Sequence, residues 1–213
     1  MLTPQVDAIP GTTPLGIPSD TTADVPVDHT VELDVRALKA LIGITTPKDA
    51  SREYDGVNMR IHTGRVTLTA TNGHMLVRVT TDSIGDSAGD ATYWIDRATI
   101  KALPAKNVDT RINVETGQIV AGALTLTPTP LGRPFPDCDA VISRSSEPLE
   151  DVDPTVNVNP SLLGSVLTGL GKIAAHPVSM MLEGASSPIR VTGTMAEGAG
   201  DILALIMPMR SGR

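Results

Sequence analysis

Three segments of the chain share one order of apolar and polar positions. In each segment, a short alternating run leads into a polar residue and then into apolar residues at helical spacing. Alternation at every second residue predicts a strand, whereas apolar residues three and four positions apart predict a helix with one face toward a core. The predicted helices cover Val35–Ile42, Arg97–Leu103 and Pro160–Leu170.

The polar residue directly before each predicted helix suits a helix start. Asp34, Asp96 and Asn159 stand at these positions. Such side chains accept a backbone N–H of the first turn and stabilise a helix by about 1 kcal/mol. Pro160 follows in the first turn, where helices tolerate proline best. The three starts recur about every 60 residues, a period that indicates an array of similar supersecondary units.

Further alternating runs follow each predicted helix and are separated by turn residues. Asn72 and Gly73, between two such runs, are a strong hairpin signal. The strands predicted after the three helices are 57–62, 64–70 and 75–80, then 110–114, 118–121 and 124–127, then 178–182, 189–192 and 202–207. Each unit is therefore predicted to be β-α-β-β-β, an α+β pattern. Neither one helix nor one small sheet buries its apolar face alone, so the units must pack together.

These patterns divide the chain into four regions. Residues 1–28 hold five prolines and no Lys or Arg, which predicts a disordered arm. Residues 29–143 form a predicted domain of two units, 144–154 a polar and acidic linker, and 155–213 a third unit. Because three is an odd number, the third unit is expected to lack a partner within its chain. We expect the chain to form a homo-oligomer through the uncovered helix face and sheet edge of this third unit.

Charge is distributed unevenly along the chain. The formal net charge is −7, which argues against a simple nucleic-acid binder. The first two predicted helices nevertheless carry basic residues and, apart from their caps, no acid. These residues are Arg36, Lys39, Arg97 and Lys101, with Lys106 just beyond the second helix. They form either a basic face toward phosphates or ordinary solvated helix surfaces. Aromatic residues make up 2% of the chain, too few for a base-stacking platform, so any nucleic acid would be contacted through its phosphates.

No arrangement of reactive residues in the sequence points to catalysis, a metal or a cofactor. The four histidines share no metal-ligand spacing, and the sequence has neither a phosphate-binding loop nor a nucleophile elbow. Cys138 is the single cysteine, no apolar run reaches the roughly 20 residues of a membrane span, and the N-terminus does not read as a secretory signal. We therefore expect a non-enzymatic, cytoplasmic protein that binds no membrane.

Two distant motifs resemble one protein family. Residues 70–76, Ala-Thr-Asn-Gly-His-Met-Leu, resemble the A-T-D-G-H-R-L hairpin of the bacterial sliding clamp, the β subunit of DNA polymerase III. Residues 206–210, Ile-Met-Pro-Met-Arg, resemble its C-terminal V-M-P-M-R. Shorter matches lie in order between them at 135–137, 158–163 and 187–190. The resemblance spans residues 30–210 and describes a shortened, divergent relative of that family.

The resemblance implies the DNA-clamp fold, with helices on one side lining the hole of a ring and antiparallel sheets on the other. It implies a processivity factor that encircles duplex DNA, with sequence-independent phosphate contacts from the basic helix residues and from Lys106. It also implies a pocket for a short peptide motif of the replicative polymerase and the clamp loader. By matching position, the pocket residues are Thr71, Gly73, His74, Met75, Leu76, Met207, Pro208, Met209 and Arg210.

The chain departs from the family in ways that keep other functions open. Asn72 replaces an acidic residue of the hairpin and Met75 a basic one, and three units stand where a bacterial clamp has six. The leading hypothesis is a shortened clamp that forms a ring. The alternative is a clamp-like adaptor or decoy that binds clamp-interacting motifs without encircling DNA, which the lack of basic residues in the third helix favours. A third hypothesis is a small structural domain with neither activity.

Overall fold

A computed structural model describes residues 29–45, 54–82, 90–104, 108–145, 156–182, 184, 187–196 and 200–209. The helices are α1 (Val35–Ile44), α2 (Arg97–Ala102), α3 (Cys138–Arg144) and α4 (Pro160–Leu170). The strands are β1 (Thr30–Glu32), β2 (Gly56–His62), β3 (Arg65–Thr71), β4 (Met75–Asp82), β5 (Ala91–Asp96), β6 (Thr110–Asn113), β7 (Ile119–Ala121), β8 (Leu124–Leu126), β9 (Ala174–Met181), β10 (Ile189–Met195) and β11 (Gly200–Ile206). The strands form two antiparallel sheets, in the orders β1-β6-β7-β8 and β5-β2-β3-β4-β11-β10-β9.

The three repeated helices begin where the sequence predicts. The Asp34 side chain accepts the N–H of Arg36, the Asp96 side chain that of Thr99, and the Asn159 side chain that of Ser161. The strand predicted just before α4 is wrong, because residues 156–159 lie outside any strand. The third unit is therefore α-β-β-β in this structure, although its alternating run and its cap match those of the first two units.

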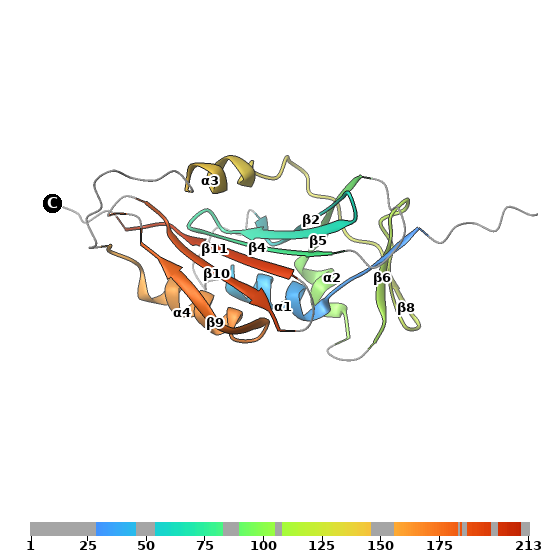
Figure 1. Cartoon of the computed structure of the whole chain (residues 1–213). Coiled ribbons are helices and arrows are strands. Elements are labelled where there is room, and N and C mark those ends of the chain that lie inside the picture. The colour runs from blue at the N-terminus through green and yellow to red at the C-terminus, as the bar shows by residue number, and fades with distance from the viewer. Residues whose placement is uncertain are drawn as a thin grey trace, which may run out of the picture.

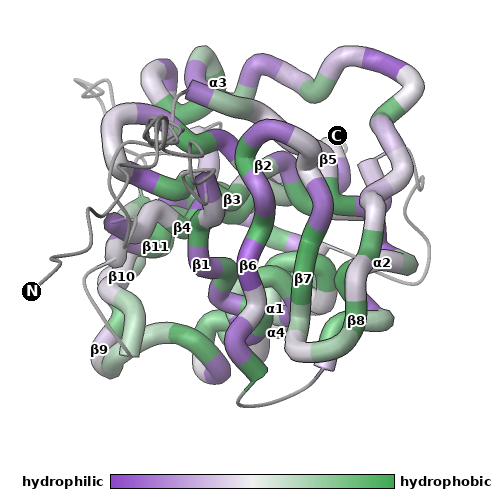
Figure 2. The backbone as a smooth tube through the Cα atoms, turned by 90° about the vertical axis from the view of Figure 1, so that its right-hand side faces the viewer, coloured by the Kyte–Doolittle hydropathy of each residue, from purple (hydrophilic) through white to green (hydrophobic). Residues whose placement is uncertain are grey.

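The first two units are interlocked by an exchange of strands. Strand β1, which precedes α1, pairs antiparallel with β6 of the second unit. Strand β5, which precedes α2, pairs antiparallel with β2 of the first unit. Each sheet therefore takes its outermost strand on one side from the other unit, and neither unit is complete alone. The four-stranded sheet that results faces the viewer in Figure 2.

The third unit is attached to the first through both a sheet and a helix. Strand β11 pairs with β4 from Gly200 opposite Thr81 to Ile206 opposite Met75, which makes one sheet of seven strands. Helix α4 packs so closely on α1 that a Cβ added at Gly169 would lie 2.0 Å from Ile44 Cγ1. The expectation that the third unit lacks a partner within its chain is wrong on this side, because β4 offered an open edge and Gly169 lets the helices approach.

The sheets and helices form layers around one main core (Figure 1). Helices α1, α2 and α4 lie on one side of the seven-stranded sheet and α3 lies across its other side. Leu38, Leu41, Met59, Ile100 and Val166 are buried between the sheets and the helix layer. The predicted α+β class is confirmed, and the three repeated helices lie on one side of the sheet as predicted, whereas α3 lies on the other side. Helix α3 was not predicted, although Asp137 at its cap and the helical spacing of Cys138, Val141 and Ile142 are signals of the same kind as those of the other helices.

Several predicted regions lie outside the described residues. They are the arm 1–28 and all of the linker 144–154 except Arg144 and Ser145, which end α3 and cap it. The division into a domain at 29–143 and a third unit at 155–213 stays a prediction, although a continuous sheet joins the two. Within the described part of the chain, no helix is long and apolar enough to cross a membrane.

Candidate functional site

The two motifs that define the predicted pocket are brought side by side by the pairing of β4 with β11. Leu76 lies opposite Leu205 in this pair of strands, and the N–H of Met207 donates to the carbonyl of His74 at 2.9 Å. The hairpin before β4 and the segment after β11 therefore form one surface, although they come from distant parts of the chain.

The hairpin tip is held by its own side chains. The Thr71 hydroxyl donates to the carbonyl of Met75 at 2.8 Å, and Asn72 Oδ1 accepts the N–H groups of His74 and Met75, each at 3.0 Å. Gly73 has a φ of +85°, which only glycine adopts without strain. Because Asn72 accepts these bonds through an oxygen, as an aspartate would, its difference from the family motif leaves the shape of the turn intact.

Met75 and Leu76 point to opposite faces of the sheet, as neighbours in a strand do. Met75 is 2% exposed and belongs to the main core on the helix side. Leu76 faces the other side and packs with Leu205 and Cys138. Met75 therefore supports the sheet from within and is not available to a bound peptide. Leu76 is 5% exposed and is buried on the opposite side of the sheet, where the two motifs meet.

Helix α3 covers this surface, and sequence analysis did not include it in the site. Phe135, Val141 and Ile142 from α3 and the segment before it pack around the Leu76–Leu205–Cys138 cluster. The signal that could have found it is residues 135–137, which match the family motif and end in Asp137, the cap of α3. Burial raises the pKa of Cys138 to about 11, so this thiol stays protonated at neutral pH and acts as an apolar packing group.

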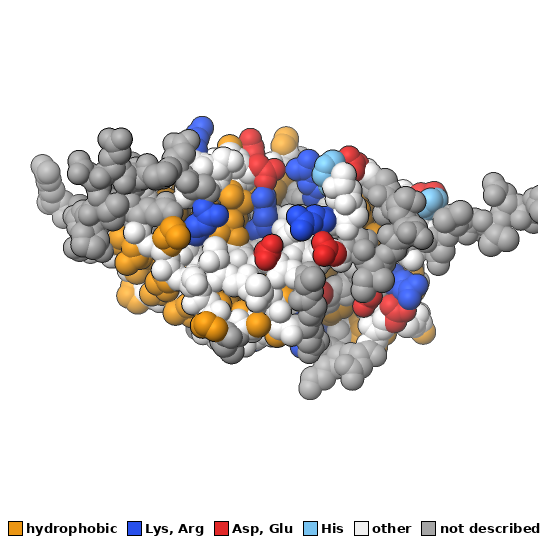
Figure 3. Space-filling model, in the orientation of Figure 1, with side chains coloured by type: hydrophobic (Ala, Val, Ile, Leu, Met, Phe, Trp, Pro, Cys, Tyr) orange, Lys and Arg blue, Asp and Glu red, His pale blue; other side chains and the backbone are white. Residues whose placement is uncertain are grey.

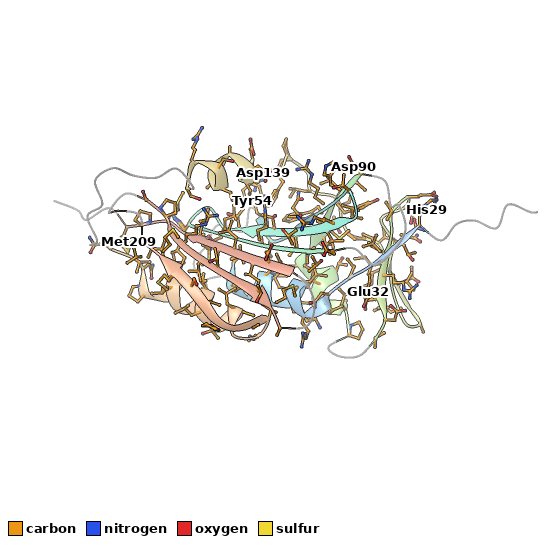
Figure 4. The ribbon with its side chains drawn as sticks, in the orientation of Figure 1. His29, Glu32, Tyr54, Asp90, Asp139 and Met209 are labelled. Carbon is orange, nitrogen blue, oxygen red and sulfur yellow. The ribbon has the colours of Figure 1, made fainter. Side chains whose placement is uncertain are left out.

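Ion pairs fix α3 to the sheet. The Asp139 carboxylate lies 2.6 Å from the Arg78 guanidinium and 3.4 Å from that of Arg60. Asp139 is labelled in Figure 4, on α3 above the sheet. Arg65 on β3 pairs with Asp82 on β4 at 3.3 Å, within the sheet itself. Arg60, Arg65, Arg78 and Asp139 line a cavity of about 580 Å³ next to α3. Because Arg60 and Arg78 share the Asp139 carboxylate and Arg65 is paired with Asp82, most of the positive charge at this cavity is neutralised by ion pairs.

Two methionines continue the apolar surface beyond the covered cluster. Met207 and Met209 are 39% and 52% exposed, and Met209 is labelled at one end of the molecule in Figure 4. The N–H of Met209 donates to the carbonyl of Asn157 at 2.7 Å, so the backbone of this segment is fixed while its side chains reach solvent. Pro208 lies between them, and Arg210, also predicted for the pocket, lies outside the described residues.

The basic residues predicted to face DNA differ in their surroundings. Lys39 Nζ donates to the carbonyl of Leu103 at 2.6 Å, at the end of α2. Arg97 pairs with Asp55 and donates to the carbonyl of Ile42 at 3.2 Å. Both therefore join elements of the protein to one another. Arg36 and Lys101 are exposed on α1 and α2, and Lys106 lies outside the described residues. Within the described residues, no cluster of His, Cys, Asp and Glu could hold a metal ion.

The chain is similar in structure to bacterial sliding clamps. It matches the DNA polymerase sliding clamp of Pseudomonas aeruginosa, solved with a ligand, at a TM-score of 0.57 and 18% identity, over 90% of this chain and 68% of that one. It matches the sliding clamp of Bartonella birtlesii bound to griselimycin at 0.55 and 13%, over 86% and 66%. It matches the β clamp of Helicobacter pylori in complex with 3,4-difluorobenzamide at 0.60 and 12%, over 84% and 65%.

These comparisons confirm the resemblance at the level of the fold. At such low identity a shared fold does not carry a shared function. The chain spans about two thirds of the length of the clamps it matches. No family model matches the sequence, and no curated protein matches it.

Proposed function

We propose that this protein is a non-enzymatic, clamp-like binding protein that docks a short peptide motif where β4 meets β11. The observation that carries the proposal is that the 71–76 hairpin meets the 207–209 segment, where Met207 and Met209 are exposed next to the buried cluster that α3 covers. Exposed methionines suit such a role, because their flexible, polarizable side chains adapt to varied apolar anchors. The fold shared with sliding clamps adds support.

The full form of this proposal is a processivity factor that encircles duplex DNA. Copies of the chain form a ring, and Arg36 and Lys101 on the helix side contact phosphates without reading sequence. The docked peptide belongs to a replicative polymerase or a clamp loader. Docking at the sheet side and DNA at the helix side leave both partners bound at once.

A second function, that of an adaptor which docks the peptide but encircles nothing, is favoured by the basic residues themselves. Lys39 and Arg97 are engaged in contacts within the protein, and α4 carries neither Lys nor Arg. Two of the basic residues predicted to face DNA are therefore held in contacts within the protein. The two functions share the peptide site and differ in whether DNA binds.

Titration of a labelled clamp-binding peptide tests the shared site. Two buried apolar anchors, less the ordering cost, give an expected dissociation constant around micromolar. Met207→Asp places a charge in the apolar surface and should weaken binding by at least about tenfold. Leu124→Asp is the matched control, because Leu124 is also 39% exposed but lies on β8 of the other sheet. Equal affinity of the Met207→Asp variant and the wild type would contradict the proposed site.

Duplex binding separates the ring from the adaptor. The double variant Arg36→Ala, Lys101→Ala should weaken association with a circular duplex and lower the slope of its salt dependence by nearly one unit per lost contact. Arg65→Ala is the control, since Arg65 lies on the sheet side and pairs with Asp82. Peptide binding with no salt-dependent association to duplex would favour the adaptor.

A further inference from the structure

In the part of the chain that the structure describes, strand β9 forms one edge of the seven-stranded sheet and lacks the partner strand that the equivalent strands of the first two units have. Strands β2, β6 and β9 are the first strands after α1, α2 and α4. Strand β2 pairs with β5, and β6 pairs with β1, each taken from the neighbouring unit. Strand β9 pairs only with β10 among the described strands. The third unit therefore holds an acceptor edge that is unused.

The third unit also holds a segment that could be given to another unit as a strand but is not paired as one. Residues 156–158, Val-Asn-Val, occupy the place before α4 that β1 and β5 occupy before α1 and α2. They alternate like a strand, yet they lie outside any strand, and the hydrogen bond from Met209 to Asn157 is their backbone contact to the end of the sheet. The third unit therefore has both a segment to give and an edge to receive one. The first two units have the same two features, and each gives its strand to the edge of the other.

We propose that the third units of two copies of this chain complete each other by the same exchange. Residues 156–158 of one copy add antiparallel to β9 of the other, around a two-fold axis. The two third units then form the interlocked pair that units one and two form within the chain. Because the exchange is reciprocal, the β9 edge of each copy is paired in the same interface. No edge is left for a third copy at this interface, so it joins two copies.

The exposure of α4 supports this partner. Leu38 and Ile42 lie four and eight residues after the cap of α1 and are 0% and 6% exposed. The residues at the same positions of α4 are Leu163, which is half-buried, and Leu167, which is 40% exposed. The face that is buried in the completed first unit is thus uncovered in the third unit, as expected if its partner unit is another molecule.

The β9 edge itself is apolar. Its last residues, Met180 and Met181, and the following Leu182 are 45%, 55% and 43% exposed. Figure 3 shows hydrophobic side chains gathered over the end of the molecule where β9 and α4 lie. Strand β9 carries no Lys, Arg, Asp or Glu, the charged residues that commonly protect an open edge, but it does contain Pro177, where its pairing with β10 is irregular. The stretch that pairs regularly with β10 and, among the described strands, stays open on its other side is the end of the strand at Ser179, Met180 and Met181. This apolar, uncharged end is the part of β9 to which a second strand would add.

The mass of the full chain in solution, measured by light scattering without DNA or peptide, tests the exchange. We expect two copies, or a multiple of two, at tens of micromolar. Leu167→Lys should raise the dimer dissociation constant by at least about tenfold. Val120→Lys should leave it unchanged, since Val120 is 42% exposed but lies on the other sheet. A monomer at all concentrations, or a dimer that Leu167→Lys does not weaken, would overturn the proposal.

Hydrogen exchange then identifies the edge involved. Amides of residues 156–158 and of β9 should be protected in the wild-type dimer and should exchange faster in the monomeric Leu167→Lys variant. Met181→Lys gives a second variant with the same expected loss of protection. A dimer in which these amides exchange as fast as in the monomer uses another surface and contradicts the exchange. Because neither measurement involves DNA or peptide, the inference goes beyond the proposed function and its failure is separate from the failure of that function.

Discussion

The first unit and the third unit have the same elements but very different surroundings. The first unit has a neighbour on both sides, because β2 receives β5 and β4 receives β11. The third unit has a neighbour on one side, where β11 meets β4, and an open edge at β9 on the other. The repeated sequence pattern therefore does not determine burial. Burial depends on whether a second unit is present to supply a strand and a helix.

The largest expected effect comes from the same helix position in the two units. Leu38→Ala should destabilise the protein by about 2–5 kcal/mol, because Leu38 is fully buried and its loss leaves a cavity. Leu163→Ala in α4 should cost about 1 kcal/mol in dilute protein, because Leu163 is only half-buried. Urea unfolding of both variants at two protein concentrations measures the loss in the free energy of unfolding. Equal costs at low concentration would show that the third unit is already complete in a single chain.

The contact that joins the two units should respond to one added methyl group. In Gly169→Ala the new Cβ would lie 2.0 Å from Ile44 Cγ1, so α4 must move away from α1. We expect destabilisation of about 1–3 kcal/mol. Gly164→Ala is the control on the same helix, because no atom lies within 4 Å of its added Cβ. It should stabilise by up to about 1 kcal/mol through helix propensity. If thermal unfolding ranks the two variants in the reverse order, α4 does not pack on α1 through Gly169.

The helix caps of the completed and the open unit should differ by a smaller amount. Asp96 accepts the N–H of Thr99 at 3.0 Å and, across to the segment after β8, the N–H of Thr129 at 2.9 Å. Asn159 accepts the N–H of Ser161 at 2.9 Å within its own helix. Asp96→Ala should therefore cost about 2 kcal/mol and Asn159→Ala about 1 kcal/mol, measured by denaturant unfolding at pH 7.

The cost of Asp96→Ala should also depend on pH. Burial acts to raise the pKa of Asp96, but hydrogen bonds from Thr99, Thr129 and Ala98 outweigh it and hold the pKa below its ordinary value. A lowered pKa in the folded protein stabilises it above the unfolded pKa, and this stabilisation is lost as pH falls through the folded pKa. The difference between wild type and Asp96→Ala should thus be complete at pH 7 and shrink below about pH 4. A difference that stays constant down to pH 2 would contradict the charged cap.

The sequence by itself determined the local elements of this protein. Asp34, Asp96 and Asn159 begin helices as their side chains predict, and most strands lie where residues alternate. Local hydrogen bonds and side-chain period act within a few residues, so they can be read from the chain. The same signals identified the hairpin at Asn72 and Gly73 and, with the family resemblance, the segment at 207–209.

Only the tertiary structure decided how these elements meet. It turned Met75 into the core and Leu76 toward α3, because alternation separates two faces without saying what covers each. It placed α3 over Leu76 and Leu205, a contact that no local pattern in the chain predicts. It also engaged Lys39 with the carbonyl of Leu103 and Arg97 with the carboxylate of Asp55. These partners are far away along the chain, so the sequence does not show that they are close in space. The run at 156–158 carries the pattern of a strand but lies outside any strand, because a strand forms only where a second edge is available to pair with it.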